Sequence, residues 1–188
     1  MISFNRPIRL RGIHAAYAQY LTTERGQKRP GGVNIFLRVM DLYMVSILLG
    51  LHYNRTASLD DSEVELKTVF GSNSSLGDKK IASSNIEADT VFASNKSLNH
   101  IYRVVMLNEN VRGLSEEDKI ANAFKSEGNQ AKIDSNIELM NSFARGGIEI
   151  LYERFQGLSK DEDEVLRVQF EILDEIYGKK SYSEEENN

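Results

Sequence analysis

The stretch VNIFLRVMDLYMVSILLGLHYNR, residues 33–55, is the most apolar part of this chain and limits its fold most strongly. A transmembrane helix needs about 20 consecutive, mostly apolar residues. Here the longest run without Asp, Glu, Lys or Arg covers only residues 42–54, and it ends in three polar side chains. A membrane span is therefore not expected, and the stretch indicates a core helix or a subunit contact.

The polar residues of this stretch have helical spacing. Asn34, Arg38 and Asp41 follow one another at i, i+4 and i+7, which places them on one stripe, and the next turns are apolar nearly all round. A helix that is apolar all round is buried. We therefore predict a central core helix over residues 33–52, with Arg38 and Asp41 paired across one turn and its last turns available to a second copy of the chain.

Helical spacing also dominates the rest of the sequence. Residues 6–11, RPIRLR, alternate in the manner of a short strand or extended arm. Apolar periodicity and capping residues predict further helices over 12–25, after Asp60, within 86–95, from Ser97, from Ser115, from Ile133 to Phe155 and from Ser159 onward. Ile120 and Phe124 are the apolar positions of the helix that starts at Ser115. The last helix is expected to turn the following residues inward: Val165, Leu166, Phe170, Leu173, Ile176 and Tyr177.

These elements predict an all-α fold: a single compact domain of about six or seven helices around the buried helix 33–52, with a short basic N-terminal arm. A length of 188 residues suits one domain. Residues 1–32 form the arm and first helix, residues 33–178 form a helical core that shares one domain with 12–32, and residues 179–188 read as a disordered acidic tail.

Charge is spread unevenly along the chain. Residues 1–55 hold eight Arg or Lys residues against two acids, a net +6, whereas the remaining 133 residues hold 15 basic and 26 acidic residues, a net −11. Such asymmetry suggests an anionic partner for the first segment. The alternative is that the basic segment packs against the acidic remainder of its own fold or of a neighbouring subunit, and both interpretations stay open. The candidate residues for binding nucleic acid or a protein partner are Arg6, Arg9, Arg11, Arg25, Lys28 and Arg29.

No motif in the chain indicates a reaction. There is no cysteine, which removes disulfides, thiolate zinc sites and cysteine nucleophiles, and no phosphate-binding glycine loop occurs. His14, His52 and His100 fall on three different predicted helices, so no metal site and no cofactor are expected. Gly147 follows another glycine inside a predicted helix, which favours either close packing against a second backbone or a kink. Together with Leu48 and Leu49 it is assigned to core or oligomer packing.

The order of these patterns resembles one protein family. RGIHAAYAQYL and IFLRVMDLYMVSILLG are followed by HIYRVVML, LSEEDKIANAF and MNSFARGGIEILYE, over residues 6–155. This is similar to the small helical accessory proteins found beside bacterial DNA-modification and anti-phage defence genes, particularly those associated with the Dnd phosphorothioation system. The resemblance implies an intracellular, non-catalytic subunit that works with a larger ATPase or nuclease, and it carries no site residues.

Three functions follow as expectations. The first is a non-catalytic accessory subunit of a bacterial antiviral defence complex, cytoplasmic because the N-terminus has no apolar signal region. It would contact a larger partner, or DNA weakly, through the basic segment, either alone or as a homo-oligomer. The second is a structural oligomerisation module with no nucleic-acid contact. The third is a metal-dependent nuclease built from His14, His52 and Asp41.

Overall fold

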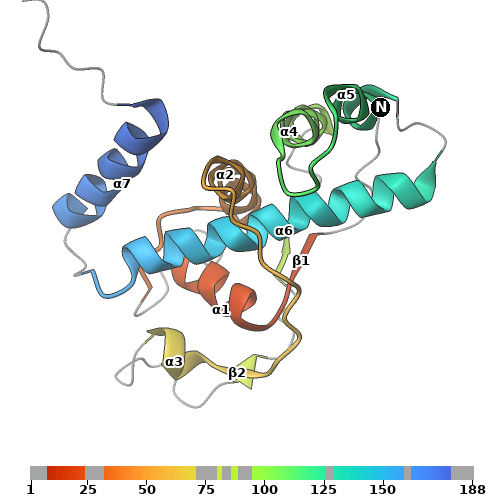
Figure 1. Cartoon of the computed structure of the whole chain (residues 1–188). Helices are drawn as coiled ribbons and strands as arrows, with labels where there is room; N and C mark the ends of the chain where they lie inside the picture. The colour runs from red at the N-terminus through yellow and green to blue at the C-terminus, as the bar shows by residue number, and fades with distance from the viewer. Residues whose placement is uncertain are drawn as a thin grey trace, which may run out of the picture.

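The computed structural model describes residues 8–23, 32–70, 80–81, 86–88, 95–125, 129–158 and 162–178. Its helices are α1 (Gly12–Leu21), α2 (Val39–His52), α3 (Leu66–Phe70), α4 (Asn95–Asn108), α5 (Glu116–Phe124), α6 (Gln130–Phe155) and α7 (Glu162–Tyr177). Its strands are β1 (Ile8–Leu10), β2 (Val64–Glu65), β3 (Lys80–Ile81) and β4 (Ile86–Ala88). The predicted all-α fold is confirmed, since seven helices dominate the described part of the chain (Figure 1).

Helix α6 runs through the middle of the molecule and α2 packs across it (Figure 1). Two apolar clusters meet at this helix pair. One cluster joins α1, α3 and α7 to it, and the other joins α4 and α5. Helix α2 contributes residues to both clusters. Leu42 and Leu49 belong to the first, and Tyr43 and Ile47 belong to the second. The α2–α6 pair is therefore the common centre of both.

The crossing of α2 and α6 depends on glycine. A Cβ atom at Gly147 would fall on the backbone carbonyl of Ser46, and one at Gly50 would fall on that of Phe143. Gly146 in the same way faces the backbone carbonyl of Arg55. Contacts with backbone atoms cannot be relieved by a change of rotamer, so a side chain at these positions would separate the two helices. This is the close backbone approach that the sequence suggested at Gly147.

Helix α2 begins six residues later than predicted. Residues 33–38 are not helical: Asn34 has a positive φ of 58°, and Phe36 forms a parallel bridge with Thr22. Val33 and Ile35 pack against the first apolar cluster from this irregular segment. The polar stripe from Asn34 to Asp41 therefore does not exist, although Arg38 and Asp41 do pair, with Nη2 2.6 Å from Oδ1.

Leu48 is not a core residue of the described chain, so of the two roles predicted for it, core or oligomer packing, only oligomer packing stays open. Leu49 is 1% exposed and Leu48 is 44% exposed. Neighbouring positions on a helix point about 100° apart, and α2 turns only part of its surface towards α6. Val45 is exposed on the same outer side as Leu48. The outer face of α2 is therefore apolar and uncovered within one chain.

Short strands replace two predicted helical segments. β1 pairs antiparallel with β4, with Ile8 opposite Ala88, so the helix predicted within 86–95 is wrong at its first three residues. The expected strand at 6–11 is present over Ile8–Leu10. The segment after Asp60 forms β2, which pairs with β3, before α3 begins at Leu66. Residues 89–94 of this predicted helix lie outside the described residues.

The helices of the second half largely follow their periodicity. The stripe predicted for α4 is buried at Leu98, Ile101, Tyr102, Val105 and Met106. Ser115 caps α5, accepting a hydrogen bond from the backbone N–H of Asp118 at 3.2 Å. Ile120 and Phe124, the apolar positions of α5, are exposed. Five of the six inward positions predicted for α7 are wrong, because Leu166, Phe170, Leu173, Ile176 and Tyr177 are exposed and Val168 and Ile172 are buried instead.

No helix within the described ranges has the length and apolar character that crossing a bilayer requires.

Candidate functional site

Of the six residues of the predicted basic surface, the structure describes only Arg9 and Arg11. Arg6, Arg25, Lys28 and Arg29 lie outside the described residues. Arg9 lies in β1 opposite Glu87, and Arg11 donates to Asp61, with Nη1 2.9 Å from Oδ1. For Arg11 the interpretation that the basic segment packs against acids of its own fold therefore applies. Tyr17 and Tyr20 also face inward, Tyr17 stacking on Tyr152 with ring centroids 3.8 Å apart and Tyr20 being buried.

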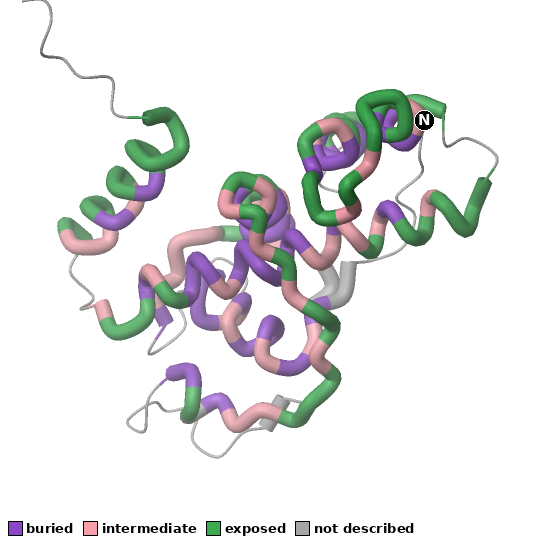
Figure 2. The backbone as a smooth tube through the Cα atoms, in the orientation of Figure 1, coloured by how far each residue is buried: buried purple, intermediate pink, exposed green. Residues whose placement is uncertain are grey.

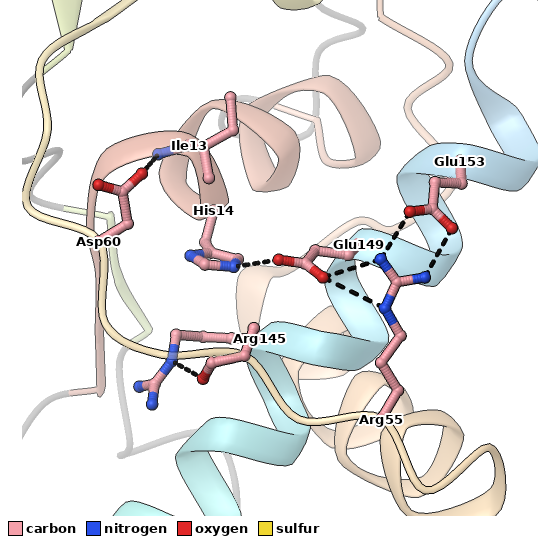
Figure 3. Close-up of polar contacts among 8 residues, drawn as sticks. Ile13, His14, Arg55, Asp60, Arg145, Glu149 and Glu153 are labelled. Atoms are coloured by element: carbon pink, nitrogen blue, oxygen red, sulfur yellow. Dashed lines mark hydrogen bonds and ion pairs between the residues drawn. The ribbon is translucent and has the colours of Figure 1, made fainter.

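A polar cluster joins α1, α6 and the segment after α2 (Figure 3). We call His14, Arg55, Glu149 and Glu153 the His14 cluster. His14 Nε2 lies 3.1 Å from Glu149 Oε1. The guanidinium of Arg55 donates to Glu149 Oε2 at 2.9 Å and to both carboxylate oxygens of Glu153 at 2.6 and 2.7 Å. Residues that are far apart in the sequence thus form one chain of charges.

Burial determines the protonation of this cluster. His14 is 2% exposed, and desolvation lowers the pKa of its imidazole, although the hydrogen bond to Glu149 acts in the opposite direction. Arg55 lowers the pKa of the Glu153 carboxyl through its hydrogen bonds. Burial of His14 therefore disfavours the charged form of its imidazole. Nδ1 of His14 is buried and has no hydrogen-bond partner among the described residues.

A histidine paired with a carboxylate is an arrangement used for general base catalysis. Such a base must lie within hydrogen-bond reach of a substrate proton, whereas His14 is enclosed between α1 and α6. The surrounding contacts are those of a structural joint. Asp60 accepts from the backbone N–H of Ile13 at 3.3 Å and supplies a negative charge to the first turn of α1. Arg145 Nε donates to the carbonyl of Ala57 at 2.8 Å, which holds the same segment against α6 (Figure 3).

The three residues of the expected nuclease site do not meet. His14 is enclosed on α1, Asp41 pairs with Arg38 at the start of α2, and His52 lies at the end of α2. Eleven residues of helix separate Asp41 from His52, about 16 Å at 1.5 Å per residue. Over the ranges that the structure describes, no group of three His, Asp or Glu residues could hold a metal ion.

A second polar network lies between α4, α5 and α6. Glu109 is fully buried and accepts from Arg112 Nε at 2.8 Å, and Arg112 also donates to Asn136 Oδ1 at 2.8 Å. Asn136 donates to the hydroxyl of Tyr102 at 2.7 Å. A buried carboxylate is tolerated where it is paired and hydrogen-bonded, so this network fixes the α4–α5 connection against α6.

Helix α7 has two apolar faces, one covered and one exposed. Val165, Val168 and Ile172 pack against the first apolar cluster. Four other residues, which we call the outer stripe, are Leu166, Phe170, Leu173 and Tyr177. At 100° per residue the outer stripe is centred about 140° around the helix from the packed residues. Phe170 is 62% exposed and Tyr177 is 80% exposed, and most of α7 is exposed in Figure 2.

Acidic residues border the outer stripe. On the helical wheel Glu162 lies next to it on one side, and Asp163 and Asp174 lie next to it on the other. The helix carries six acids and one cation, Arg167, which lies 3.7 Å from Glu171. Glu175, on the side that faces the molecule, is engaged by Arg154 and by the hydroxyl of Tyr53. The exposed apolar face is therefore bordered mainly by acids, with Arg167 beside Asp174 on one side.

Two exposed cations and a histidine lie along one side of α4. Lys96, His100 and Arg103 are exposed at i, i+4 and i+7 and line a cleft of about 570 Å³ together with Ser97, Asn99 and Ile101. Arg103 also lies over the ring of Phe124, 5.1 Å from its centroid. The spacing of these three residues is present in the sequence, but the uneven charge of the chain predicted a basic site in the N-terminal segment instead.

No related protein provides information on the His14 cluster or on the outer stripe. Comparisons with family models, with curated proteins and with solved structures found no match to this chain.

Proposed function

We propose that this chain is a non-catalytic accessory subunit that acts by docking a larger protein onto the outer stripe of α7. In the setting that the sequence resemblance implies, the larger protein is the ATPase or nuclease of a DNA-targeting defence complex. The proposal relocates the docking surface from the basic N-terminal segment to the C-terminal helix. One observation carries it: α7 holds four large apolar side chains in a row that the chain itself leaves uncovered.

Energetics support a partner at this face. Fully burying a Leu or Phe side chain contributes about 1.5–3 kcal/mol. Four such residues in one stripe offer several kcal/mol to a complex before the cost of association is subtracted. Scattered exposed apolar residues are ordinary, but a contiguous row is typical of an interaction surface. The burial of His14, which is 2% exposed between α1 and α6, supports the non-catalytic part of the proposal.

Association measured with stripe variants tests the proposal. The triple variant Leu166→Ser, Phe170→Ser and Leu173→Ser removes the apolar face while leaving the packed residues of α7 in place. We expect it to melt like the wild type and to lose the partner in quantitative co-purification from source cells. The purified partner should then bind the wild type in a two-component titration at least tenfold more tightly than it binds the variant. Equal binding would reject the proposal.

The matched control removes apolar side chains from a different face. Val45 and Leu48 are exposed on α2. The double variant Val45→Ser and Leu48→Ser should keep the α7 partner. This variant also examines the structural alternative, a self-associating module. If sedimentation shows that the wild type is an oligomer and that the α2 variant is a monomer, α2 is a contact between copies of the chain.

Weak contact with DNA is a second candidate function, favoured by the basic row on α4. Lys96 and Arg103 can contact phosphates, and each such contact releases counterions, so binding should fall steeply with salt. Replacing Lys96, His100 and Arg103 by alanine should lower both the affinity for a DNA duplex and the dependence of that affinity on salt. Replacing Arg9 and Arg11 by alanine in the same measurement tests whether the N-terminal segment contacts DNA. An unchanged salt dependence in both variants would leave only protein docking.

A further inference from the structure

We propose that one end of the α4–α5 hairpin binds single-stranded nucleic acid, with cations of α4 holding phosphates and the ring of Phe124 stacking on a base. This inference rests on the second candidate function, contact with nucleic acid through α4, and deepens it by naming the kind of strand. It follows from an arginine that has no acidic partner, from the exposed ring beside that arginine, and from the position of the nearby acids.

Arg103 differs from the other arginines of the described chain. Every other arginine whose side chain the structure describes lies 2.6 to 3.7 Å from a carboxylate oxygen. Arg103 forms no such pair among the described residues, and its guanidinium lies over the ring of Phe124, 5.1 Å from the centroid. The N–H donors of this guanidinium are therefore available to an anionic ligand, and a phosphate is the anion whose geometry they match best in nucleic acids.

Two further groups extend the row along α4. His100 and Lys96 lie one and two turns before Arg103 on the same exposed side, and neither is paired with a carboxylate within the described ranges. All three line the cleft of about 570 Å³. The row is about 10 Å long at 1.5 Å per residue. It therefore forms a short track of two cations and an imidazole beside a hollow.

The acids of α5 lie at the opposite end of the hairpin. Lys119 Nζ donates to Asn110 Oδ1 at 3.1 Å, and the hydroxyl of Tyr102 donates to the carbonyl of Asn122 at 3.2 Å. These contacts show that α4 and α5 run in opposite directions (Figure 1). The three acids at residues 116–118 therefore lie beside the end of α4, about 9 to 12 Å along α5 from the exposed ring.

The charges closest to Phe124 in the sequence favour an anion as well. Lys125 follows the ring directly and is exposed. At the start of α6, Lys132 and Asp134 are both exposed and offset each other, and Asp134 also accepts from Gln130 Nε2 at 2.8 Å. The end of the hairpin that carries the ring is therefore positive within the described residues, although the whole chain carries a net charge of −5.

The exposed ring favours a single strand over a duplex. Phe124 is 53% exposed at the end of α5. In a duplex the bases are paired and stacked on one another, whereas an unpaired base can stack on an aromatic side chain. Cations alone would not distinguish the two forms, because both carry phosphates. An acidic protein segment would satisfy the cations but would leave the ring without a base.

Anisotropy of labelled oligonucleotides added to the full chain tests this inference. The probes are an oligo(dT) strand of about 12 nucleotides, a length typical of single-strand sites, and a duplex of equal length. The salt concentration is kept low because the chain is acidic overall. We expect the strand to bind at least tenfold more tightly than the duplex. No binding of the strand, or equal binding of the duplex, would overturn the inference.

A pair of variants on α5 separates stacking from general apolar contact. Phe124→Leu removes the ring and keeps an apolar side chain, and we expect it to melt like the wild type and to bind oligo(dT) about fivefold or more weakly. Ile120→Ala is the matched control, because it truncates an exposed aliphatic residue one turn away. It should bind like the wild type. Equal losses in the two variants would contradict stacking.

The salt dependence tests the row on α4. Each phosphate contact with a single strand contributes about 0.7 to the slope of log affinity against log salt. The variant Lys96→Gln, Arg103→Gln should therefore lower the slope by about 1.4, whereas Arg167→Gln, which removes an exposed cation of α7, should leave it unchanged. An unchanged slope in the α4 variant, or displacement of oligo(dT) by poly-glutamate as readily as by unlabelled oligo(dT), would overturn the inference.

The results separate this inference from the proposed function. If the chain binds no nucleic acid but the α7 triple variant loses its partner, docking is supported and this inference is wrong. If a duplex binds as tightly as the strand and depends on Lys96 and Arg103, contact with DNA is supported and the preference for a single strand is wrong. If oligo(dT) binds as predicted while the triple variant keeps every partner, this inference stands and docking on α7 is wrong.

Discussion

The crossing of α2 and α6 and the helix α7 are both rich in apolar residues, but they end in opposite situations. At the crossing, glycines bring two backbones into contact and every neighbouring apolar residue on that face is buried. In α7, one face is buried and a second, equally apolar, is exposed. The comparison shows that apolar periodicity indicates how much surface a helix could bury. The packing of the other elements determines how much of that surface is buried in the fold.

The largest effect is expected at the crossing. Gly147→Leu places a side chain on the backbone of α2, which cannot move aside without separating α2 from α6. We expect a loss of at least about 4 kcal/mol in the free energy of unfolding, or failure to fold. Urea titration followed by circular dichroism measures it. Ala131→Leu, which adds the same side chain to an exposed position of α6, is the control and should change little. A stable Gly147→Leu variant would show that the crossing tolerates separation.

Two neighbouring leucines sharpen the comparison within α2. Leu49→Ala leaves a cavity in the first apolar cluster, and we expect it to cost about 2–5 kcal/mol. Leu48→Ala truncates an exposed side chain and should stay within about 0.5 kcal/mol. The same denaturant titration measures both, at a protein concentration where the chain is monomeric. A large effect at Leu48 that depends on protein concentration would identify a subunit contact.

The two faces of α7 allow the same experiment in one helix. Ile172→Ala removes packed side-chain atoms at the edge of the core and should cost about 1–3 kcal/mol. Phe170→Ala removes a larger side chain from the exposed face and should leave the stability of the isolated chain nearly unchanged. Equal destabilisation by the two substitutions would mean that the outer stripe is covered within the chain, and the docking proposal would lose its basis.

The smallest effect concerns the polar joint within the covered region. The pKa of His14 is lowered from its ordinary 6.5 by burial, so in acid the unfolded chain binds a proton that the folded chain resists. The free energy of unfolding should therefore fall as the pH drops below about 6.5, with Glu149, Asp60 and Arg145 setting how far. His14→Gln should flatten this part of the profile. Glu153, whose pKa is lowered, contributes only at lower pH, near and below its ordinary 4.5.

Strong local signals predicted the helices well. The α4 stripe and the Ser115 cap depend on residues within a few positions of one another, so their patterns are sufficient. The helix predicted over residues 33–38 was wrong because a spacing of i, i+4 and i+7 also occurs by chance in an irregular segment. The contact that holds this segment, the bridge between Phe36 and Thr22, joins residues that are distant in the sequence. The prediction of which face of α7 is buried was wrong. Apolar residues cover a wide arc of this helix, so its sequence is compatible with burial of either of two faces.

The candidate sites were harder to predict because they join distant residues. His14 and Glu149 are 135 positions apart, and Arg55 and Glu149 are 94 apart, so no spacing reveals either pair. The outer stripe was visible in the sequence as periodicity, but not as exposure. A large apolar residue on a helix is ordinarily assigned to the core, and only the packing of Val168 and Ile172 shows that the other face is left over.

The backbone contact at Gly147 also has a mechanical consequence. Helix α6 has 26 residues, about 39 Å of rod, and α2 crosses it without an intervening layer of side chains. A helix contact made by side chains can adjust when those side chains change rotamer. A contact between two backbones cannot adjust in this way. In a complex of the kind proposed, a force applied to α7 would therefore be transmitted along α6 towards α4 and α5.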